Sequence, residues 1–146
     1  MLYMVRHGER CDNSAEPEER LRAKANPMDP PLTQLGISQA AILGQSQRDY
    51  LKKHNYKKIV IESSPFLRCL QTAAAFAKEL GITYITTNYR ASEFLGDHIY
   101  DKQPFDHLEI TRHTAEEISE KWLQGVTLVI NNEFEEEIRK CYPEER

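Results

Sequence analysis

Short apolar runs alternate with longer amphipathic segments over the first two thirds of the chain. The apolar runs predict three buried strands, at residues 3–5, 59–61 and 82–87. Two segments with apolar residues at near-helical spacing, 33–53 and 66–80, predict helices between them. This alternation implies right-handed crossovers, so we expect an α/β domain with a mainly parallel sheet flanked by helices.

Both predicted helices have recognisable boundary signals. Thr33 follows two prolines and suits the N-cap of the first helix, in which Gly44 is expected to allow close packing on the sheet. Pro65 suits the first turn of the second helix, and Gly81 suits its end.

The other segments have weaker patterns. Residues 12–31 carry alternating charges and several prolines, and they predict a long loop with one short helical turn near 18–25. Such a loop lines the mouth of a site or is a mobile surface insertion. Residues 88–113 have few periodic apolar positions, whereas 115–123 predict a helix, 126–130 a strand and 133–140 an acidic helix.

Length and composition narrow the class of protein. The 146 residues, 40% hydrophobic and 29% charged, suit a single domain spanning 1–146. A net charge of −4 argues against a nucleic-acid partner, and no apolar run approaches the roughly 20 residues that span a bilayer. The start of the chain has no visible secretory signal, so a cytoplasmic setting is expected. Cys11, Cys69 and Cys141 form no zinc pattern and are expected to be reduced.

The candidate chemistry follows the first predicted strand. There Gly8 permits a sharp turn, and His7 lies between Arg6 and Arg10. A neutral imidazole can act as a nucleophile near pH 7, and guanidinium groups bind phosphate by forked hydrogen bonds. The alternative is a surface loop whose Arg and His side chains are only solvated.

Two further motifs follow in order. They are Pro31-Leu32-Thr33 with Gly36, and Ser63-Ser64-Pro65 with Arg68, Gln71 and Thr72. Together with Arg-His-Gly-Glu-Arg at 6–10, they resemble the histidine phosphatase superfamily, also called phosphoglycerate-mutase-like. The second arginine of the first motif and the stretch after Ser64 look most like the STS/TULA-type phosphatase domains. The resemblance covers residues 2–93 and fades beyond them.

The resemblance implies the first part of a histidine phosphatase fold and a phosphomonoesterase that needs neither metal nor cofactor. In the family, His7 would attack phosphorus, Arg6, Arg10 and Arg68 would bind the phosphate, and Glu93 would protonate the leaving alcohol. A phosphorylated protein or small molecule is the implied substrate. For Arg68 the alternative is an ion pair on the helix surface, and for Glu93 an exposed loop residue.

Other phosphatase chemistries lack their motifs. None of the three cysteines has an arginine at the spacing of a phosphate loop, and Asp97-His98 and Asp106-His107 match a metal site only loosely.

One feature departs from the family pattern. The family carries a second catalytic histidine after a later apolar strand, whereas here the run at 127–130 leads into Asn131-Asn132, and no histidine follows His113. The chain is therefore expected to lack the C-terminal part of the fold, either as a fragment or as a shortened relative. A non-catalytic phosphate-binding or scaffolding protein is the alternative function, and a mutase is a third. Without the later strand, residues 1–146 are expected to catalyse poorly, and to form a homo-oligomer or pair with a segment that completes the sheet.

Overall fold

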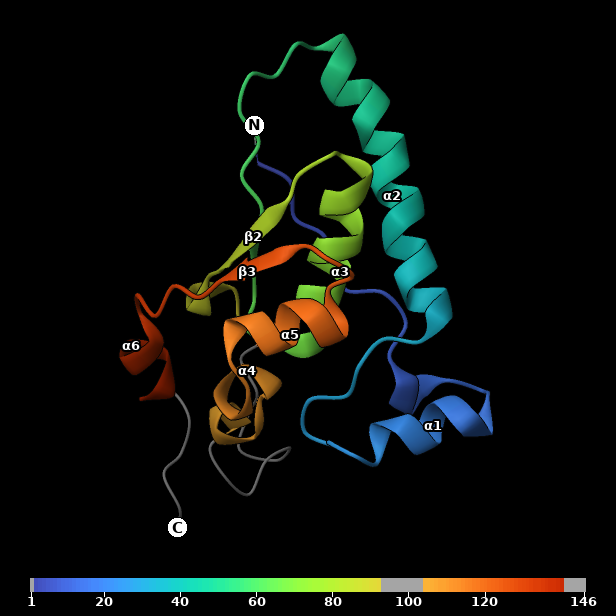
Figure 1. Cartoon of the computed structure of the whole chain (residues 1–146), viewed down its shortest axis with the longest axis vertical. Helices are drawn as coiled ribbons and strands as arrows, with labels where there is room; N and C mark the ends of the chain where they lie inside the picture. The colour runs from blue at the N-terminus through green and yellow to red at the C-terminus, as the bar shows by residue number, and fades with distance from the viewer. Residues whose placement is uncertain (1, 93–103, 141–146) are drawn as a thin grey trace.

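The computed structural model describes residues 2–92 and 104–140 (Figure 1). The helices are α1 (Pro17–Ala23), α2 (Gln34–Lys53), α3 (Leu67–Glu79), α4 (Glu109–Arg112), α5 (Ala115–Trp122) and α6 (Glu135–Arg139). The strands are β1 (Glu62–Ser63), β2 (Tyr84–Thr87) and β3 (Thr127–Val129). Short 3₁₀ turns occupy Cys11–Asn13, Tyr89–Ala91 and Pro104–His107.

The three strands form a parallel sheet in the order β1-β2-β3. The register pairs Glu62 with Thr86 and Tyr84 with Thr127. Figure 1 shows β2 and β3 running beside each other across the middle of the molecule, with α2 and α3 packed side by side. The predicted α/β class with a parallel sheet is confirmed.

One hydrophobic core joins α3, the sheet and the short helices of the second half of the chain. Its fully buried members are Phe66, Leu70, Ile85, Phe105, Leu108 and Ile118. Because α3 contributes every third or fourth residue to this core, its apolar face fixes the helix against β2. The first turn of α3 is thereby held in place beyond the ends of β1 and β2.

The predicted ends of the two long helices are confirmed, apart from the place of Pro65. Thr33 caps α2, since its hydroxyl oxygen accepts a hydrogen bond from the backbone N–H of Gly36 at 2.9 Å. α3 starts at Leu67, so Pro65 precedes its N-cap, Phe66, and does not lie in its first turn as predicted. The helix is followed by Gly81, whose φ of 73° is left-handed. Gly44 packs on α3 rather than on the sheet, because a Cβ there would lie 2.8 Å from Glu79 Cβ and 2.9 Å from the Phe76 carbonyl oxygen.

The predicted strand at residues 3–5 is wrong. Tyr3, Met4 and Val5 form no strand, and they are 49%, 89% and 46% exposed. An apolar run becomes a buried strand only when a neighbouring strand supplies ladder hydrogen bonds, and no strand described here pairs with it. The run at 3–5 has the apolar composition of a strand, but no neighbouring strand for it is among the described residues.

The other strands differ from their predictions at the ends. The run at 59–61 is not buried, since Val60 is 55% exposed, and it leads into β1, which starts at Glu62. Ile61 still contributes its carbonyl oxygen, which accepts a hydrogen bond from Thr86 N. β2 and β3 lie within the predicted segments 82–87 and 126–130 but are shorter than predicted.

Two segments contain more regular structure than their patterns indicated. The loop at 12–31 contains α1, a helix of seven residues that opens on Pro17. The segment 88–113 contains α4 and two 3₁₀ turns. Of the later helices, α5 and α6 lie within the predicted segments 115–123 and 133–140.

Candidate active site

His7 is half-buried at the end of the extended N-terminal segment. Its Nδ1 lies 2.8 Å from the carbonyl oxygen of Gly8. Because a carbonyl oxygen only accepts, Nδ1 must donate this hydrogen bond, which leaves the lone pair of a neutral ring on Nε2. Burial lowers the pKa of His7 below its usual 6.5, and the positive charges of Arg68, Arg10 and Arg6 lower it further, against the opposing Gly8 hydrogen bond. At neutral pH the imidazole is therefore neutral, with Nε2 available as a nucleophile.

A close backbone crossing places this histidine. A Cβ on Gly8 would lie 2.3 Å from the carbonyl oxygen of Gly36, and a Cβ on Gly36 would lie 2.3 Å from the carbonyl oxygen of Glu9. Only glycine fits on either side of this contact. Thr33 fastens the same crossing, since its N–H donates to the Glu9 carbonyl oxygen at 3.0 Å and its hydroxyl to Glu9 Oε2 at 2.7 Å.

Two side chains of α3 attach this helix to the other motifs. Thr72 Oγ1 accepts a hydrogen bond from Gly8 N at 3.2 Å and donates one to the Arg68 carbonyl oxygen at 2.7 Å. Gln71 Oε1 accepts from Leu32 N at 2.7 Å. These two motif residues had no assigned role in the sequence, and the structure shows that they connect the His7 turn and the start of α2 to α3.

Arg68 lies in the first turn of α3 and is only 2% exposed. Its guanidinium carbon lies over the Phe66 ring, 4.2 Å from the ring centre, a cation–π contact that helps to hold the side chain. This burial contradicts the alternative of an ion pair on the helix surface. The hydrogen bond from Gly8 N to Thr72 Oγ1 on the same helix shows that the structure brings the two motifs together.

The other two predicted arginines are less enclosed. Arg10 donates hydrogen bonds to both carboxylate oxygens of Asp12, from Nε at 2.9 Å and from Nη2. An anion bound by Arg10 would therefore compete with Asp12. Arg6 is exposed, and its charge also lowers the pKa of His7. Their phosphate-binding roles stay predictions.

Of the remaining predicted groups, Glu93 and Asp97-His98 lie outside the described residues. Asp106 is ion-paired with Arg139 at 2.8 Å. Within 2–92 and 104–140, no three His, Cys, Asp or Glu side chains gather in a way that could hold a metal ion. The thiol of Cys11 is buried beside Glu19, and this burial raises its pKa to about 12, so it stays protonated at neutral pH.

Sequence reasoning missed Asp29, which is fully buried in the loop before α2. Its Oδ1 accepts a hydrogen bond from Leu67 N at 2.8 Å, and its Oδ2 accepts one from Glu109 N at 3.0 Å. Burial raises the pKa of this carboxyl from 3.8 to about 7, although both hydrogen bonds and the charge of Arg68 oppose the shift. The only signal in the sequence was an acidic residue placed directly before two prolines.

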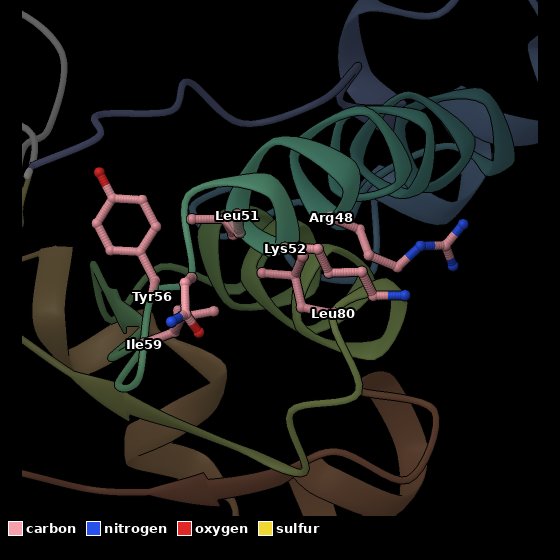
Figure 2. A pocket seen from close by; sticks show the side chains of 7 residues that line it. Arg48, Leu51, Lys52, Tyr56, Ile59 and Leu80 are labelled. Atoms are coloured by element: carbon pink, nitrogen blue, oxygen red, sulfur yellow. The ribbon is translucent and has the colours of Figure 1, made fainter.

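A separate pocket of about 300 Å³ lies at the other end of α2 (Figure 2). Its lining includes Arg48, Leu51, Lys52 and Tyr56, and the charged ends of Arg48 and Lys52 extend to the same side of it. Carboxylates already lie near Arg48, with Asp49 at 3.8 Å and Glu79 at 3.9 Å. With a rise of about 1.5 Å per residue, Lys52 lies about 24 Å along the helix from Gly36, so this pocket is distinct from the His7 cluster.

Comparisons with known proteins agree with the motif pattern. The family model of the histidine phosphatase superfamily (branch 1) matches residues 2–98. Similar relatives are two proteins named probable phosphoglycerate mutase GpmB, from Yersinia pestis (strain Pestoides F) and Yersinia pseudotuberculosis serotype O:1b (strain IP 31758). Each is 33% identical over 107 residues, which cover 73% of this chain and 43% of the relative. The chain thus spans less than half the length of these curated relatives.

The STS/TULA subtype suggested by the motifs is not among these matches and stays a prediction. In the parts of the chain that the structure describes, no helix is both long enough and apolar enough to cross a bilayer.

Proposed function

Since this chain belongs to the histidine phosphatase superfamily, we propose that its protein hydrolyses phosphomonoesters through a phosphohistidine on His7. The observation that carries this proposal is the state of the imidazole. Its Nδ1 donates a hydrogen bond to the Gly8 carbonyl oxygen, and its pKa is lowered by burial and by the positive charges of Arg68, Arg10 and Arg6. A neutral nucleophile within a positively charged site suits attack on a phosphate ester.

The proposed reaction has two steps. In the first, Nε2 of His7 forms a bond to phosphorus while the bond from phosphorus to the ester oxygen breaks, and the departing alkoxide takes a proton from an acid. In the second, water attacks the phosphohistidine and gives a proton back to that acid, the phosphorus–nitrogen bond breaks, and inorganic phosphate leaves. In both steps negative charge is spread over the phosphoryl oxygens, where the guanidinium groups of Arg6, Arg10 and Arg68 would offset it.

The position of Arg68 supports its role in this scheme. It lies on the first turn of α3, where the positive end of the helix dipole favours an anion. Its burial keeps water from screening the guanidinium charge, so a phosphate held there would feel this charge more strongly than at an exposed arginine.

Vanadate binding tests the anion site. We expect the variant Arg68→Ala to bind vanadate about 10²-fold more weakly than the unaltered chain, the usual effect of removing one preorganised donor. The measurement is a calorimetric titration at neutral pH. Arg48→Ala, which removes a guanidinium at the far end of α2, is the matched control and should bind normally. Equal affinity in the chain and in Arg68→Ala would exclude Arg68 from the site.

Glu93 is proposed as the acid that protonates the leaving group. The variant Glu93→Gln should slow an alkyl phosphate about 10²-fold or more, because an alkoxide leaves poorly without a proton. It should slow p-nitrophenyl phosphate far less, since that phenolate is a good leaving group. Rates for both substrates in both proteins are the measurement, and an equal loss for the two substrates would point to a structural role.

A second candidate function is phosphate binding without turnover. It is suggested by the run at 127–130, which leads into Asn131-Asn132, whereas the family pattern has a catalytic histidine after a later apolar strand. Vanadate binding without any phosphohistidine would support this candidate over the hydrolase. A mutase reaction is the third candidate, suggested by the name of the Yersinia relatives, probable phosphoglycerate mutase.

A further inference from the structure

The buried carboxylate of Asp29 connects three segments that are distant in the sequence. It belongs to the loop before α2, and it accepts hydrogen bonds from Leu67 N, 38 residues along the chain, and from Glu109 N, 80 residues along. These two N–H groups belong to the first residues of α3 and α4. Asp29 thus supplies acceptors to two helix N-termini that would otherwise hold unpaired donors in the interior.

The neighbourhood of Asp29 fixes its side chain. Asn26 Oδ1 accepts a hydrogen bond from Asp29 N at 3.3 Å, and Asn26 Nδ2 donates to Glu109 Oε1 at 2.8 Å. Glu109 is also held by His113, with its Oε2 3.1 Å from His113 Nε2, and by Arg112 at 3.9 Å. A carboxylate with both oxygens engaged inside such a network has little freedom to turn away.

Arg68 follows Leu67 directly, so the hydrogen bond to Leu67 N fixes the backbone from which the guanidinium extends. The two charges also interact, because Arg68 lowers the pKa of Asp29 while Glu109 raises it. Arg68 in turn lowers the pKa of His7. Asp29 therefore interacts with Arg68, and Arg68 in turn interacts with the imidazole of His7.

We propose that Asp29 is a positioning residue of this site. Its side chain fixes the first turn of α3, and when Asp29 is ionised its negative charge lowers the affinity of Arg68 for an anion. This inference rests on the proposed function, since it assumes that Arg68 binds the phosphate. Like charges oppose each other inside a protein, so an anion bound by Arg68 must disfavour ionised Asp29. By linkage, ionised Asp29 must disfavour the anion by the same factor.

The charged groups that act on Asp29 are Arg68 on α3 and Glu109 on α4, and Glu109 is itself paired with His113 and Arg112. With a pKa of about 7, Asp29 is neutral at pH 5.5 and ionised at pH 8.5. Anion affinity should therefore fall as the pH rises through 7. His7 loses its proton below 6.5 and contributes a separate fall at lower pH.

The test is a carbon-13 NMR titration of the Asp29 carboxyl in the chain 1–146, with and without saturating sulfate. Sulfate stays dianionic over this range, whereas phosphate itself takes up a proton. We expect sulfate to raise the pKa of Asp29 by about 1 unit, the scale of a nearby like charge. Sulfate affinity should then fall about tenfold across this titration. The carboxyl signal of Asp49, at the far end of α2, is the control in the same spectra and should not respond to sulfate.

Variants separate the two parts of the inference. Asp29→Asn should lose the fall in sulfate affinity around pH 7 and should melt at a lower temperature, because an amide offers one acceptor oxygen in place of two. If Asp29→Asn does not fold, the titration of the unaltered chain still tests whether sulfate raises the pKa of Asp29. Sulfate that binds without moving the pKa of Asp29 would overturn this inference and leave the proposed function standing. Sulfate that does not bind at all would overturn both.

Discussion

Replacing His7 with asparagine should abolish the transfer of a phosphoryl group to the protein. Asparagine keeps a polar side chain of similar size but has no nitrogen lone pair able to attack phosphorus. Where a nucleophile is removed from a preorganised site, the loss is on the order of 10⁴-fold or more. The measurement is the amount of acid-labile, base-stable phosphate on the protein after it is mixed with a radiolabelled aryl phosphate and quenched with base.

The control for this prediction is His54→Asn. His54 caps the far end of α2, and its ring centre lies 4.3 Å from that of Tyr50, so its loss should leave labelling unchanged. Vanadate should still bind to His7→Asn, since the arginines remain, and this result would show that the variant is folded. Labelling of His7→Asn at the level of the unaltered chain would move the nucleophile to another histidine and contradict the proposed mechanism.

The helices that carry the site could be predicted because their signals are local. Thr33 accepts a hydrogen bond from a residue three positions away, and Gly81 needs only its own left-handed φ to end α3. Arg68 could be placed on the first turn of α3 by counting from Pro65. Such signals depend on neighbours in the sequence, so no knowledge of the tertiary fold is needed to read them.

Strand pairing and buried polar contacts could not be predicted in the same way. The run at 3–5 has the composition of a strand, but pairing depends on a partner that its own sequence does not specify. The role of Asp29 depends on Leu67 and Glu109, 38 and 80 residues away. The sequence shows that an acidic residue is present, and only the fold shows that its two oxygens accept hydrogen bonds from the first residues of two helices.

The exposed apolar residues near the N-terminus bear on the predicted partner. Leu2 and Met4 are 86% and 89% exposed, and Val60 is 55% exposed. Exposed apolar extended segments favour association, because they offer both apolar area and unpaired backbone groups. A homo-oligomer, or a segment that completes the sheet, therefore stays the prediction for this face.

Replacing Gly36 with alanine should destabilise the chain, although glycine to alanine within a helix ordinarily stabilises by about 1 kcal/mol. The new Cβ would lie 2.3 Å from the Glu9 carbonyl oxygen and 2.7 Å from Glu9 N, and these backbone atoms are held by the hydrogen bonds to Thr33 and Gln39. Relieving the clash requires the two backbones to separate. We expect a loss of about 3 kcal/mol in the free energy of unfolding, the upper end for overpacking, seen as a melting temperature lower by about 10 °C.

The expected loss of stability in Gly36→Ala is opposite in sign to the usual effect of glycine to alanine in a helix. Gln45→Ala, at an exposed position of the same helix, is the control and should shift the free energy of unfolding by less than about 0.5 kcal/mol. Because the displaced backbone carries Glu9 and adjoins Gly8, the Gly36→Ala variant should also bind sulfate more weakly than the unaltered chain, even well below its melting temperature. An increase in stability would mean that the segment 6–10 does not cross α2 as closely as the structure shows. The position of His7 would then need another explanation, since this crossing is what holds the imidazole beside Arg68.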